Sequence, residues 1–371
     1  MKALRLVSTA FAAVALTLGS ASAFAVQPAQ QSLVKVKPSA SQILNASKSI
    51  NRFAHARVAS HVGAAARPAL EQRSTAAQGA SGKGEGDGLQ SGPRFPPDLT
   101  YQGGPVITKL TSHNSYVDTL QVCADLTTCW GNPTGFLADL GRSDFVHVID
   151  QFVSAYYDNR YTVDPVGLAY TVDSTGAPAV TPYYGVPPST AGFTSPVVMT
   201  DLDIEILALT AADITGKDGY EHQFHIFLAP GTDLCFDNSY TQCYSPDNYK
   251  TFYFCAYHGS FDTTDGRHIL YSAEPYANTP GCQDTGSAPN GALTDSTNNT
   301  LSHELFETIT DPDGNGWRNL TSNAMYGQEI GDECSFINAT GFDPSVFTVE
   351  DKVYAAQPEY SNREHACIVS P

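Results

Sequence analysis

The charged residues of this chain are divided unevenly, and that division limits which part of it can fold as one domain. Residues 1–100 carry 11 Lys and Arg against 4 Asp and Glu, a net charge of +7. Residues 101–371 carry 9 against 34, a net charge of −25, which leaves the whole chain at −18. Nucleic-acid binding needs clustered Lys and Arg, so this excess of acid argues against it. We expect a basic leader followed by one acidic domain over residues 98–371.

The first 25 residues predict a secretory signal peptide. Lys2 and Arg5 form a short positive region, residues 6–18 are apolar, and the small residues at 21–25 fit a cleavage site. An N-terminal anchor that is never cleaved is the alternative. No other apolar run reaches the roughly 18 residues of a membrane span. We therefore expect a secreted or extracellular protein, with a periplasmic or cell-surface location also open.

Residues 26–97 have the composition of a low-complexity linker or a pro-segment. They are rich in Ala, Ser, Gln and Gly, and residues 76–92 are typical of a flexible linker. Residues 41–61 can be read as one amphipathic helix. A basic pro-segment that lies on the acidic domain and a disordered exported leader are both compatible with this stretch.

Eight cysteines suit an exported protein, because disulfides persist in oxidising compartments. Eight cysteines allow 105 connectivities, so proximity along the chain is the only guide to their pairing. Thiolate metal binding is the alternative, but no C-x2-C repeat supports it. Proximity predicts four local disulfides: Cys123 with Cys129, Cys235 with Cys243, Cys255 with Cys282, and Cys334 with Cys367.

The acidic region predicts a single mixed-sheet domain of the α/β or α+β class, with a helix that resembles the active-site helix of metalloproteases. Hydrophobic residues make up 42% of the chain, enough for a sizeable core. Strands interleaved with helices favour this class over an all-α or all-β fold. We expect strands that open at Val106-Ile107 and that cover 224–228, 251–258 and 268–272, and helices within 134–157, 201–214 and 302–310.

The helix over 302–310, which Ser302 could cap and Pro312 stops, carries the main chemical signal. His303 and Glu307 stand four residues apart, so one helical turn brings both side chains to the same face. With Glu304 they form H-E-x-x-E, a variant of the H-E-x-x-H motif in which two ligands hold zinc and a glutamate takes a proton from water. We expect His303 and Glu307 to bind the metal and Glu304 to be the catalytic base.

Further oxygen ligands could come from the turn that precedes Cys334. Glu329 and Asp332 lie there between glycines, and either could complete a zinc site, since carboxylates are ordinary zinc ligands. Asp332 could instead orient His303 through a hydrogen bond. A cluster of buried hydrogen bonds without any metal is the structural alternative for all these residues.

A second motif overlaps the end of this helix. Asp311, Asp313 and Asn315 follow the D-x-D-x-N-G pattern of the first half of a calcium loop. The closing glutamate of an EF-hand is absent, because its position is Ser322. A different calcium loop and a plain Asp/Asn/Gly turn both stay open.

Taken together, these segments resemble the EXORDIUM-like (phosphate-induced protein) family of exported proteins. The resemblance rests on residues 302–312, Trp317, 329–334, and three further segments: residues 101–105, 254–259 and 360–367. It covers roughly 99–371 and implies an extracellular or cell-wall-associated protein with one mixed domain. It also implies a functional role for the matching positions, which are His303, Glu304, Glu307, Glu329 and Asp332. The Asp311-x-Asp313 pair is not part of the family pattern.

Two function hypotheses follow. The first is an exported metal-dependent hydrolase, similar to a zinc metallopeptidase, that acts on a peptide or a cell-wall substrate. The second is a non-catalytic extracellular protein in which the cluster holds a structural metal or a hydrogen-bond network. His258 is a weaker site candidate, because it ends a strand that could border the catalytic helix and line a substrate cleft, and a packed structural histidine is the favoured interpretation. We interpret His225 as a packed structural histidine. No G-x-S-x-G elbow or phosphate-binding glycine motif is present, which argues against a serine hydrolase or a nucleotide enzyme. The oligomeric state is not predicted.

Overall fold

A mixed eight-stranded sheet forms the centre of the computed structural model, which describes residues 31–59, 97–170, 192–248, 250–283, 288–320, 329–334 and 345–371. The strands of this sheet are β1 (Ser32–Val36), β2 (Ile50–Ala59), β4 (Leu110–Val117), β5 (Tyr161–Val163), β6 (Val166–Tyr170), β8 (His222–Leu228), β11 (Tyr257–Thr263) and β12 (His268–Glu274). Their order is β1-β6-β4-β8-β12-β11-β2, with β5 paired to β4. From β1 to β12 neighbours run parallel, whereas β11 is antiparallel to both β12 and β2. The predicted mixed-sheet domain is therefore confirmed.

Helices and four small sheets surround this sheet. The small sheets pair β3 (Thr100–Tyr101) with β13 (Trp317–Arg318), β9 (Thr232–Cys235) with β7 (Val197–Thr200) and β10 (Cys243–Tyr244), β14 (Ser345–Val349) with β15 (Lys352–Ala356), and β16 (Glu359–Ser361) with β17 (Ala366–Ile368). The helices are α1 (Ala40–Ser49), α3 (Leu126–Trp130), α4 (Pro133–Leu140), η1 (Asp144–Ile149), α5 (Asp150–Val153), α6 (Asp201–Thr215), α7 (Ala292–Thr310) and η3 (Asp332–Cys334).

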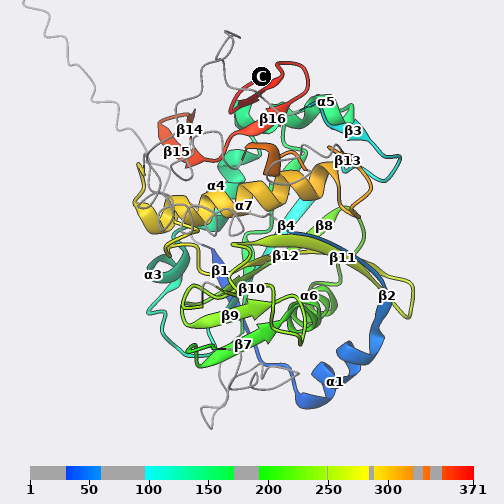
Figure 1. Ribbon diagram of the computed structural model, residues 1–371, viewed down its shortest axis with the longest axis vertical. Coiled ribbons are helices and arrows are strands. Elements are labelled where there is room, and N and C mark those ends of the chain that lie inside the picture. The colour runs from blue at the N-terminus through cyan, green and yellow to red at the C-terminus, as the bar shows by residue number, and fades with distance from the viewer. Residues whose placement is uncertain are drawn as a thin grey trace, which may run out of the picture.

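The two longest helices lie on opposite faces of the sheet, with α7 above it and α6 below it in the view of Figure 1. Because side chains alternate between the faces of a strand, β8 contributes to both layers. Phe224 and Ile226 pack in the core that contains α6, whereas Phe227 packs in the core that contains α7. The sheet is thus buried on both faces, as expected for a largely parallel sheet.

Helix α7 is longer than the sequence predicts. It ends at Thr310, immediately before Asp311-Pro312, as expected, but it begins at Ala292 rather than near Ser302. Ser302 lies inside the helix and donates its hydroxyl to the Asn299 carbonyl at 3.1 Å, so it is not the cap. Residues 292–300 are rich in Thr, Asn and Ser, which have low helix propensity. Burial against the sheet overrides that propensity.

The leader also departs from the prediction. The expected helix over 41–61 stops at Ser49, and residues 50–59 form strand β2 instead. The backbone of β11 explains this change, because its outer N–H and C=O groups find partners in β2. Strand β1, from the same segment, pairs with β6 at the other edge of the sheet. Residues 32–59 thus supply both edge strands, so the sheet includes part of the stretch predicted as linker or pro-segment.

Two predicted strand boundaries are also wrong. Of the expected strand over 251–258, only the last two residues belong to β11, which runs from Tyr257 to Thr263. The preceding residues are tied to other segments by the Cys255–Cys282 disulfide and by an isolated bridge between Phe252 and Cys243. The strand expected to open at Val106-Ile107 begins at Leu110.

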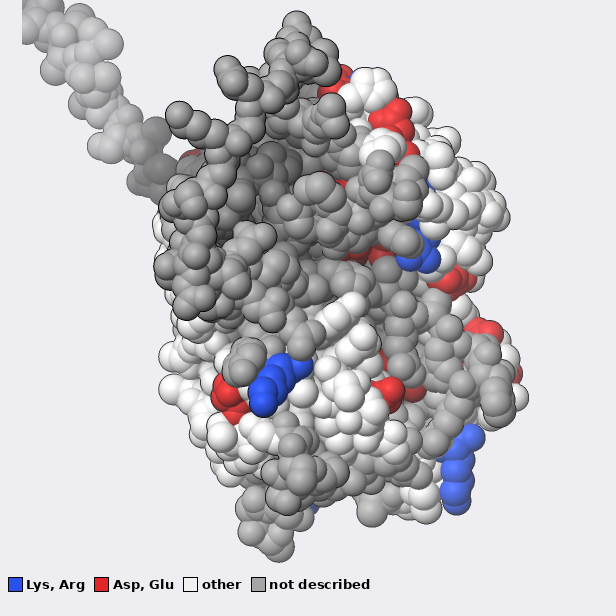
Figure 2. Space-filling view, in the orientation of Figure 1, with Lys and Arg blue, Asp and Glu red and all other residues white. Residues whose placement is uncertain are grey.

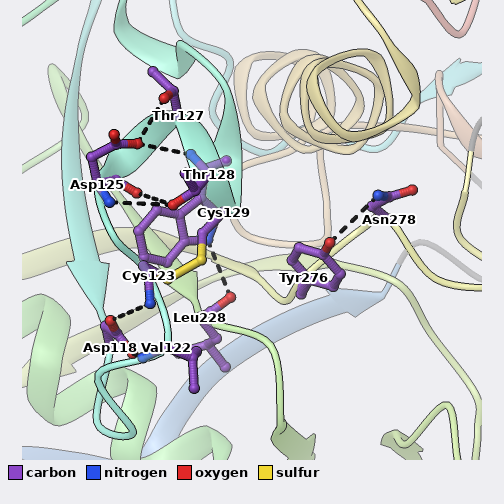
Figure 3. Close-up of a disulfide and its surroundings, with 11 residues drawn as sticks. Asp118, Val122, Cys123, Asp125, Thr127, Thr128, Cys129, Leu228, Tyr276 and Asn278 are labelled. Carbon is purple, nitrogen blue, oxygen red and sulfur yellow. Dashed lines mark hydrogen bonds between the residues drawn. A yellow bond between two sulfur atoms is a disulfide. The ribbon is translucent and has the colours of Figure 1, made fainter.

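All four predicted disulfides form: Cys123–Cys129, Cys235–Cys243, Cys255–Cys282 and Cys334–Cys367. Figure 3 shows the first of these, where the Asp118 carboxylate accepts the N–H groups of Val122 and Cys123, both at 2.9 Å. The Cys334–Cys367 disulfide spans 33 residues, and a loop of that length constrains the unfolded chain by about 3–4 kcal/mol. Four disulfides fit a protein of an oxidising compartment.

The described surface carries no concentration of basic residues in the view of Figure 2, where Lys and Arg side chains stand apart from one another. Within the ranges that the structure describes, no helix combines the length and the apolar character that a membrane span requires. The predicted signal peptide, residues 1–25, lies outside the described residues, as does the whole of the predicted linker over 76–92.

Candidate metal centre

A cluster of buried histidines and acids lies where the C-terminal half of α7 meets β11 and the turn at 329–334. We call it the α7 cluster. Each member is at most 2% exposed: His258, His303, Glu304, Glu307, Glu329 and Asp332. The five residues that the sequence predicts as catalytic or zinc-binding are thus brought together, and His258 of β11 joins them.

The helix geometry predicted for His303 and Glu307 is present. His303 Nε2 lies 3.0 Å from Glu307 Oε1, as their spacing of four residues requires. The Asp332 backbone N–H donates to the same Glu307 oxygen at 3.1 Å, and Asp332 Oδ1 lies 3.9 Å from His303 Nε2. One nitrogen or oxygen from each of these three residues falls within a span of 4.8 Å, so they could hold a metal ion.

His258 was interpreted as a structural histidine, but its contacts are those of a cluster member. Its Nδ1 lies 3.4 Å from Glu304 Oε2 and 3.6 Å from Glu307 Oε2. His258, Glu304 and Glu307 form a second group whose ligand atoms lie within 4.8 Å of one another. The only signal for His258 in the sequence is weak, a polar residue at the end of the apolar run TFYFCAYH.

Many ligand atoms of the cluster are buried without a hydrogen-bond partner. They are His258 Nδ1, His303 Nδ1 and Nε2, Glu304 Oε1 and Oε2, Glu307 Oε2, and Glu329 Oε1 and Oε2. A buried polar atom without a partner normally costs about 1–3 kcal/mol, and more when it is charged. Several of these atoms instead contact one another as ion pairs at 3.0–3.6 Å, and a bound cation would satisfy them together.

Three further buried acids surround the cluster, and of these only Asp311 was predicted as a ligand, in the calcium loop. Glu274 ends β12 and Glu359 begins β16, while Asp311 follows α7 directly. Each is at most 1% exposed, and Glu274 and Glu359 have carboxylate oxygens without a hydrogen-bond partner. A lone acid at the end of an apolar strand was the only available signal for Glu274 and Glu359.

Burial shifts the pKa values of most of these acids upward in the metal-free protein. For Glu329, burial disfavours the charged form and the neighbouring Glu307 carboxylate adds to this, so its pKa is raised well above the usual range. Burial likewise raises the pKa of Glu304, Glu274 and Glu359. Below these raised pKa values the acids hold protons in the metal-free protein, and a bound cation would displace them.

Glu307 and the two histidines behave in the opposite way. Burial opposes ionisation of Glu307, but His303 and His258 outweigh it and lower the pKa of Glu307 to about 2. Burial opposes protonation of His258, yet the carboxylates of Glu304 and Glu307 raise its pKa to about 10. Burial opposes protonation of His303 too, and the Glu307 carboxylate again dominates and raises its pKa. Glu307 is therefore the charged centre of the cluster.

The turn at 329–334 is packed tightly against α7. A Cβ atom at Gly331 would stand 2.5 Å from His303 Nδ1, so a larger residue there would push against the imidazole. The Tyr360 N–H donates to the Ile330 carbonyl at 3.1 Å, and the Cys334–Cys367 disulfide ties the turn to β17. The turn is thereby fixed from both sides, although residues 321–328 and 335–344 lie outside the described residues.

Segments far apart in the sequence converge on the same region. Gln102 and Gly104 donate their backbone N–H groups to the carbonyls of Gly316 and Asn315, just after α7. Asn362 exchanges hydrogen bonds with the backbone of Leu99, both at 2.8 Å. Three segments on which the family resemblance partly rests thus lie around the cluster: residues 101–105 border the loop after α7, residues 254–259 contain His258, and residues 360–367 contact the turn at 329–334.

The predicted calcium loop does not converge on one point. Asp313 accepts hydrogen bonds from Tyr220 and Ser260 at 2.6 and 2.7 Å, so its carboxylate is already satisfied. Asp311 accepts the backbone N–H of Gly316. The Asn315 side chain packs against Gly104 instead, where a Cβ atom would clash with it. These contacts describe a hydrogen-bonded turn.

His225 has the environment of a structural histidine, as interpreted. Its two ring nitrogens contact the hydroxyls of Ser272 and Ser112 at 2.7 and 2.9 Å. Burial lowers its pKa to about 3, so the ring is neutral. It offers a matched control for His258, because both are fully buried in strands of the same sheet.

In comparisons with known proteins, no family model matches the chain, and neither a curated protein nor a solved structure does. The resemblance to the EXORDIUM-like family therefore stays a prediction.

Proposed function

We propose that the α7 cluster is the metal centre of an exported hydrolase that acts on peptide substrates in the manner of a zinc metallopeptidase. The observation that carries this proposal is the convergence of His303, Glu307 and Asp332, whose ligand atoms lie within 4.8 Å of one another. Both ring nitrogens of His303 and one oxygen of Glu307 are buried without hydrogen-bond partners. One nitrogen and two oxygen ligands form a donor set that zinc accepts.

Each cluster residue has a role in this proposal. Zinc would supply a Lewis acid that polarises a substrate carbonyl and makes water more acidic. His303, Glu307 and Asp332 would hold it, and the hydrogen bond from the Asp332 N–H would orient the Glu307 carboxylate. Glu304 would accept a proton from the attacking water, since both of its oxygens lack partners.

The extracellular setting is part of the proposal. Four disulfides and the predicted signal peptide favour an exported protein, and the resemblance to the EXORDIUM-like family favours the cell wall. A peptide of the cell wall or its surroundings is the substrate class that fits this location.

Turnover of a mixture of internally quenched peptides tests the proposal. The purified protein should cleave some of them, lose activity on treatment with phenanthroline, and regain it when zinc is added back. His303→Gln should be inactive, whereas His225→Gln, the control in β8, should keep its activity. Cleavage that survives chelation, or cleavage that His303→Gln retains, would contradict a catalytic metal at this site.

A structural cation site is the second candidate, and complete burial of the cluster favours it. Glu304 and Glu307 are 0% exposed and His303 is 2% exposed, whereas a catalytic site must admit substrate. Closed sites of this kind contribute to folding. In that case chelation should lower the melting temperature, and no peptide should be cleaved under any metal condition.

A further inference from the structure

The carboxylate of Glu307 faces two histidines, one on each side. Its Oε1 lies 3.0 Å from His303 Nε2, while its Oε2 lies 3.6 Å from His258 Nδ1. The first oxygen also accepts the Asp332 N–H, and the second has no hydrogen-bond partner. A carboxylate presented in this way can bind one ion through each oxygen.

Two groups of possible metal ligands meet at this carboxylate. The first is His303, Glu307 and Asp332, and the second is His258, Glu304 and Glu307. Each contributes one imidazole nitrogen and one carboxylate of its own, and both use Glu307. We propose that the cluster binds two divalent transition-metal ions bridged by Glu307, an inference that rests on the proposed metal centre and extends it from one ion to two.

The orientation of His258 supports the second ion. Its Nε2 lies 3.3 Å from the Asp311 carbonyl oxygen, which can only accept, so Nε2 carries a proton. Nδ1 is thereby directed at Glu304 Oε2 and Glu307 Oε2. A histidine that ligates through one nitrogen and donates its other N–H to a backbone carbonyl is a common arrangement at metal sites.

The distances within the second group suit a metal better than a hydrogen bond. His258 Nδ1 lies 3.4 and 3.6 Å from the two carboxylate oxygens, beyond the usual 2.7–3.2 Å of an N–H···O bond. Ligands placed tetrahedrally at about 2.1 Å from zinc are roughly 3.4 Å from one another. The spacing is therefore that of atoms around a common ion.

The charge of the region points the same way. Seven acids are buried in and around the cluster: Glu274, Glu304, Glu307, Asp311, Glu329, Asp332 and Glu359. Asp311 is paired with Arg318. When deprotonated, the four acids of the cluster itself, Glu304, Glu307, Glu329 and Asp332, carry four negative charges, and one divalent ion would offset only two of them. A second ion offsets two more, which matters because unbalanced buried charge is costly.

A second ion also refines the role of Glu304. Its Oε2 belongs to the second ligand group, while Oε1 lies in the same buried cluster without a partner. Glu304 would bind the second ion through Oε2 and keep Oε1 to accept a proton. Two ions that share a carboxylate should lie about 3.5–4 Å apart.

Manganese loading of the full-length protein tests the inference. The protein is stripped with a chelator, equilibrated with Mn²⁺, freed of excess ion, and measured by elemental analysis and low-temperature electron paramagnetic resonance. Two ions per chain with an exchange-coupled spectrum are expected. One ion per chain with the spectrum of isolated Mn²⁺ would overturn the inference and leave a single-ion hydrolase possible. No bound manganese, together with no zinc after zinc loading, would overturn both.

Variants assign the two ions to their groups. His258→Gln and Glu304→Gln should each keep one ion, His303→Gln should keep the other, and all three should lose the coupled spectrum. His225→Gln, the control, should retain both ions and the coupling. Two coupled ions in His258→Gln would overturn the inference. For a variant that unfolds, the wild-type stoichiometry and spectrum still decide the question.

Discussion

Helices α6 and α7 cover opposite faces of one sheet and are both buried, but they are held there by different kinds of contact. Helix α6 packs mainly through apolar side chains such as Ile204, Leu207 and Ala211. Two of its buried acids accept hydrogen bonds: Asp201 from the hydroxyls of Tyr257 and Tyr271 at 2.8 and 2.7 Å, and Asp203 from the backbone N–H and hydroxyl of Thr200. Helix α7 instead buries His303, Glu304 and Glu307 with ligand atoms that lack hydrogen-bond partners.

The difference shows for which helix the contacts within the protein are enough to explain its burial. The interactions of α6 account for its position, because its apolar residues are buried and its first turn is capped by Thr200 and Asp203. The buried Glu304 of α7 and Glu329 beside it oppose folding at neutral pH in the absence of a cation, because burial raises the pKa of both carboxyl groups. These residues are the basis of the proposed metal centre.

The largest expected effect is on kcat, through a substitution in the proposed site on α7. Glu304→Gln removes the proposed proton acceptor with almost no change in size, and should lower kcat by about 10²–10⁴-fold. The measurement is the rate of peptide cleavage at saturating zinc, beside Asp203→Asn in α6 as a control with the same chemical change. Wild-type kcat in Glu304→Gln would remove Glu304 from the mechanism.

A core substitution in α6 should separate stability from metal binding. Leu207 is 1% exposed, so Leu207→Ala should lower the free energy of unfolding by about 2–5 kcal/mol. Denaturant unfolding measures this change, and elemental analysis of the folded protein should show the same metal content as the wild type. A loss of metal from folded Leu207→Ala would mean that the two faces of the sheet are coupled.

Replacement of one buried acid by its amide should change the free energy of unfolding in opposite directions on the two faces of the sheet. In the metal-free protein, Glu359→Gln should raise the free energy of unfolding at neutral pH by about 1 kcal/mol, because the buried acid must take up a proton on folding whereas glutamine is neutral in both states. Asp203→Asn should lower it by about 0.5–1 kcal/mol, because a negative charge is favourable at the start of α6. Equilibrium unfolding in urea with a chelator present measures both. A destabilised Glu359→Gln would indicate that the acids around α7 are satisfied without metal.

The last expected effect is a reversal in the pH dependence of stability when metal binds. In the metal-free protein the folded-state pKa of His258 is raised from 6.5 to about 10, so above pH 6.5 the folded state holds more protons than the unfolded chain. Its contribution to stability is complete below pH 6.5 and is lost as the pH rises toward 10. His225 is neutral in both states above pH 6.5 and adds no slope there.

Bound metal should change the pH dependence of stability in the other direction, because the ligands bind metal in their deprotonated forms. The melting temperature of the chelator-treated protein should therefore fall as the pH rises above 6.5, while that of the zinc-loaded protein should hold or rise. Scanning calorimetry on both forms gives the comparison. Parallel slopes for the two forms would argue against proton displacement by a metal.

Most of the α7 site follows from local patterns in the sequence. The spacing of His303 and Glu307 places both on one helical face, and Pro312 defines the end of that helix. Glycines around Glu329 and Asp332 indicate a turn, and Cys334 adds a tether. The four disulfides also follow from proximity along the chain, since each closes a short local loop.

The rest of the site depends on which elements pack together, and no local pattern contains that information. His258 belongs to the cluster because β11 lies beneath α7, and Glu359 belongs because β16 contacts the turn through the Tyr360–Ile330 hydrogen bond. The early start of α7 and the formation of strand β2 also depend on how the elements pack together. In both, burial or edge pairing outweighs residue propensity.

The metal content of the purified full-length protein tests the central claim most directly. Elemental analysis after gentle purification and zinc loading should find zinc in the wild type and in His225→Gln, and less zinc in His303→Gln. A wild-type protein that binds no zinc or manganese, or a His303→Gln variant with the full wild-type content, would contradict the claim that α7 carries a metal centre.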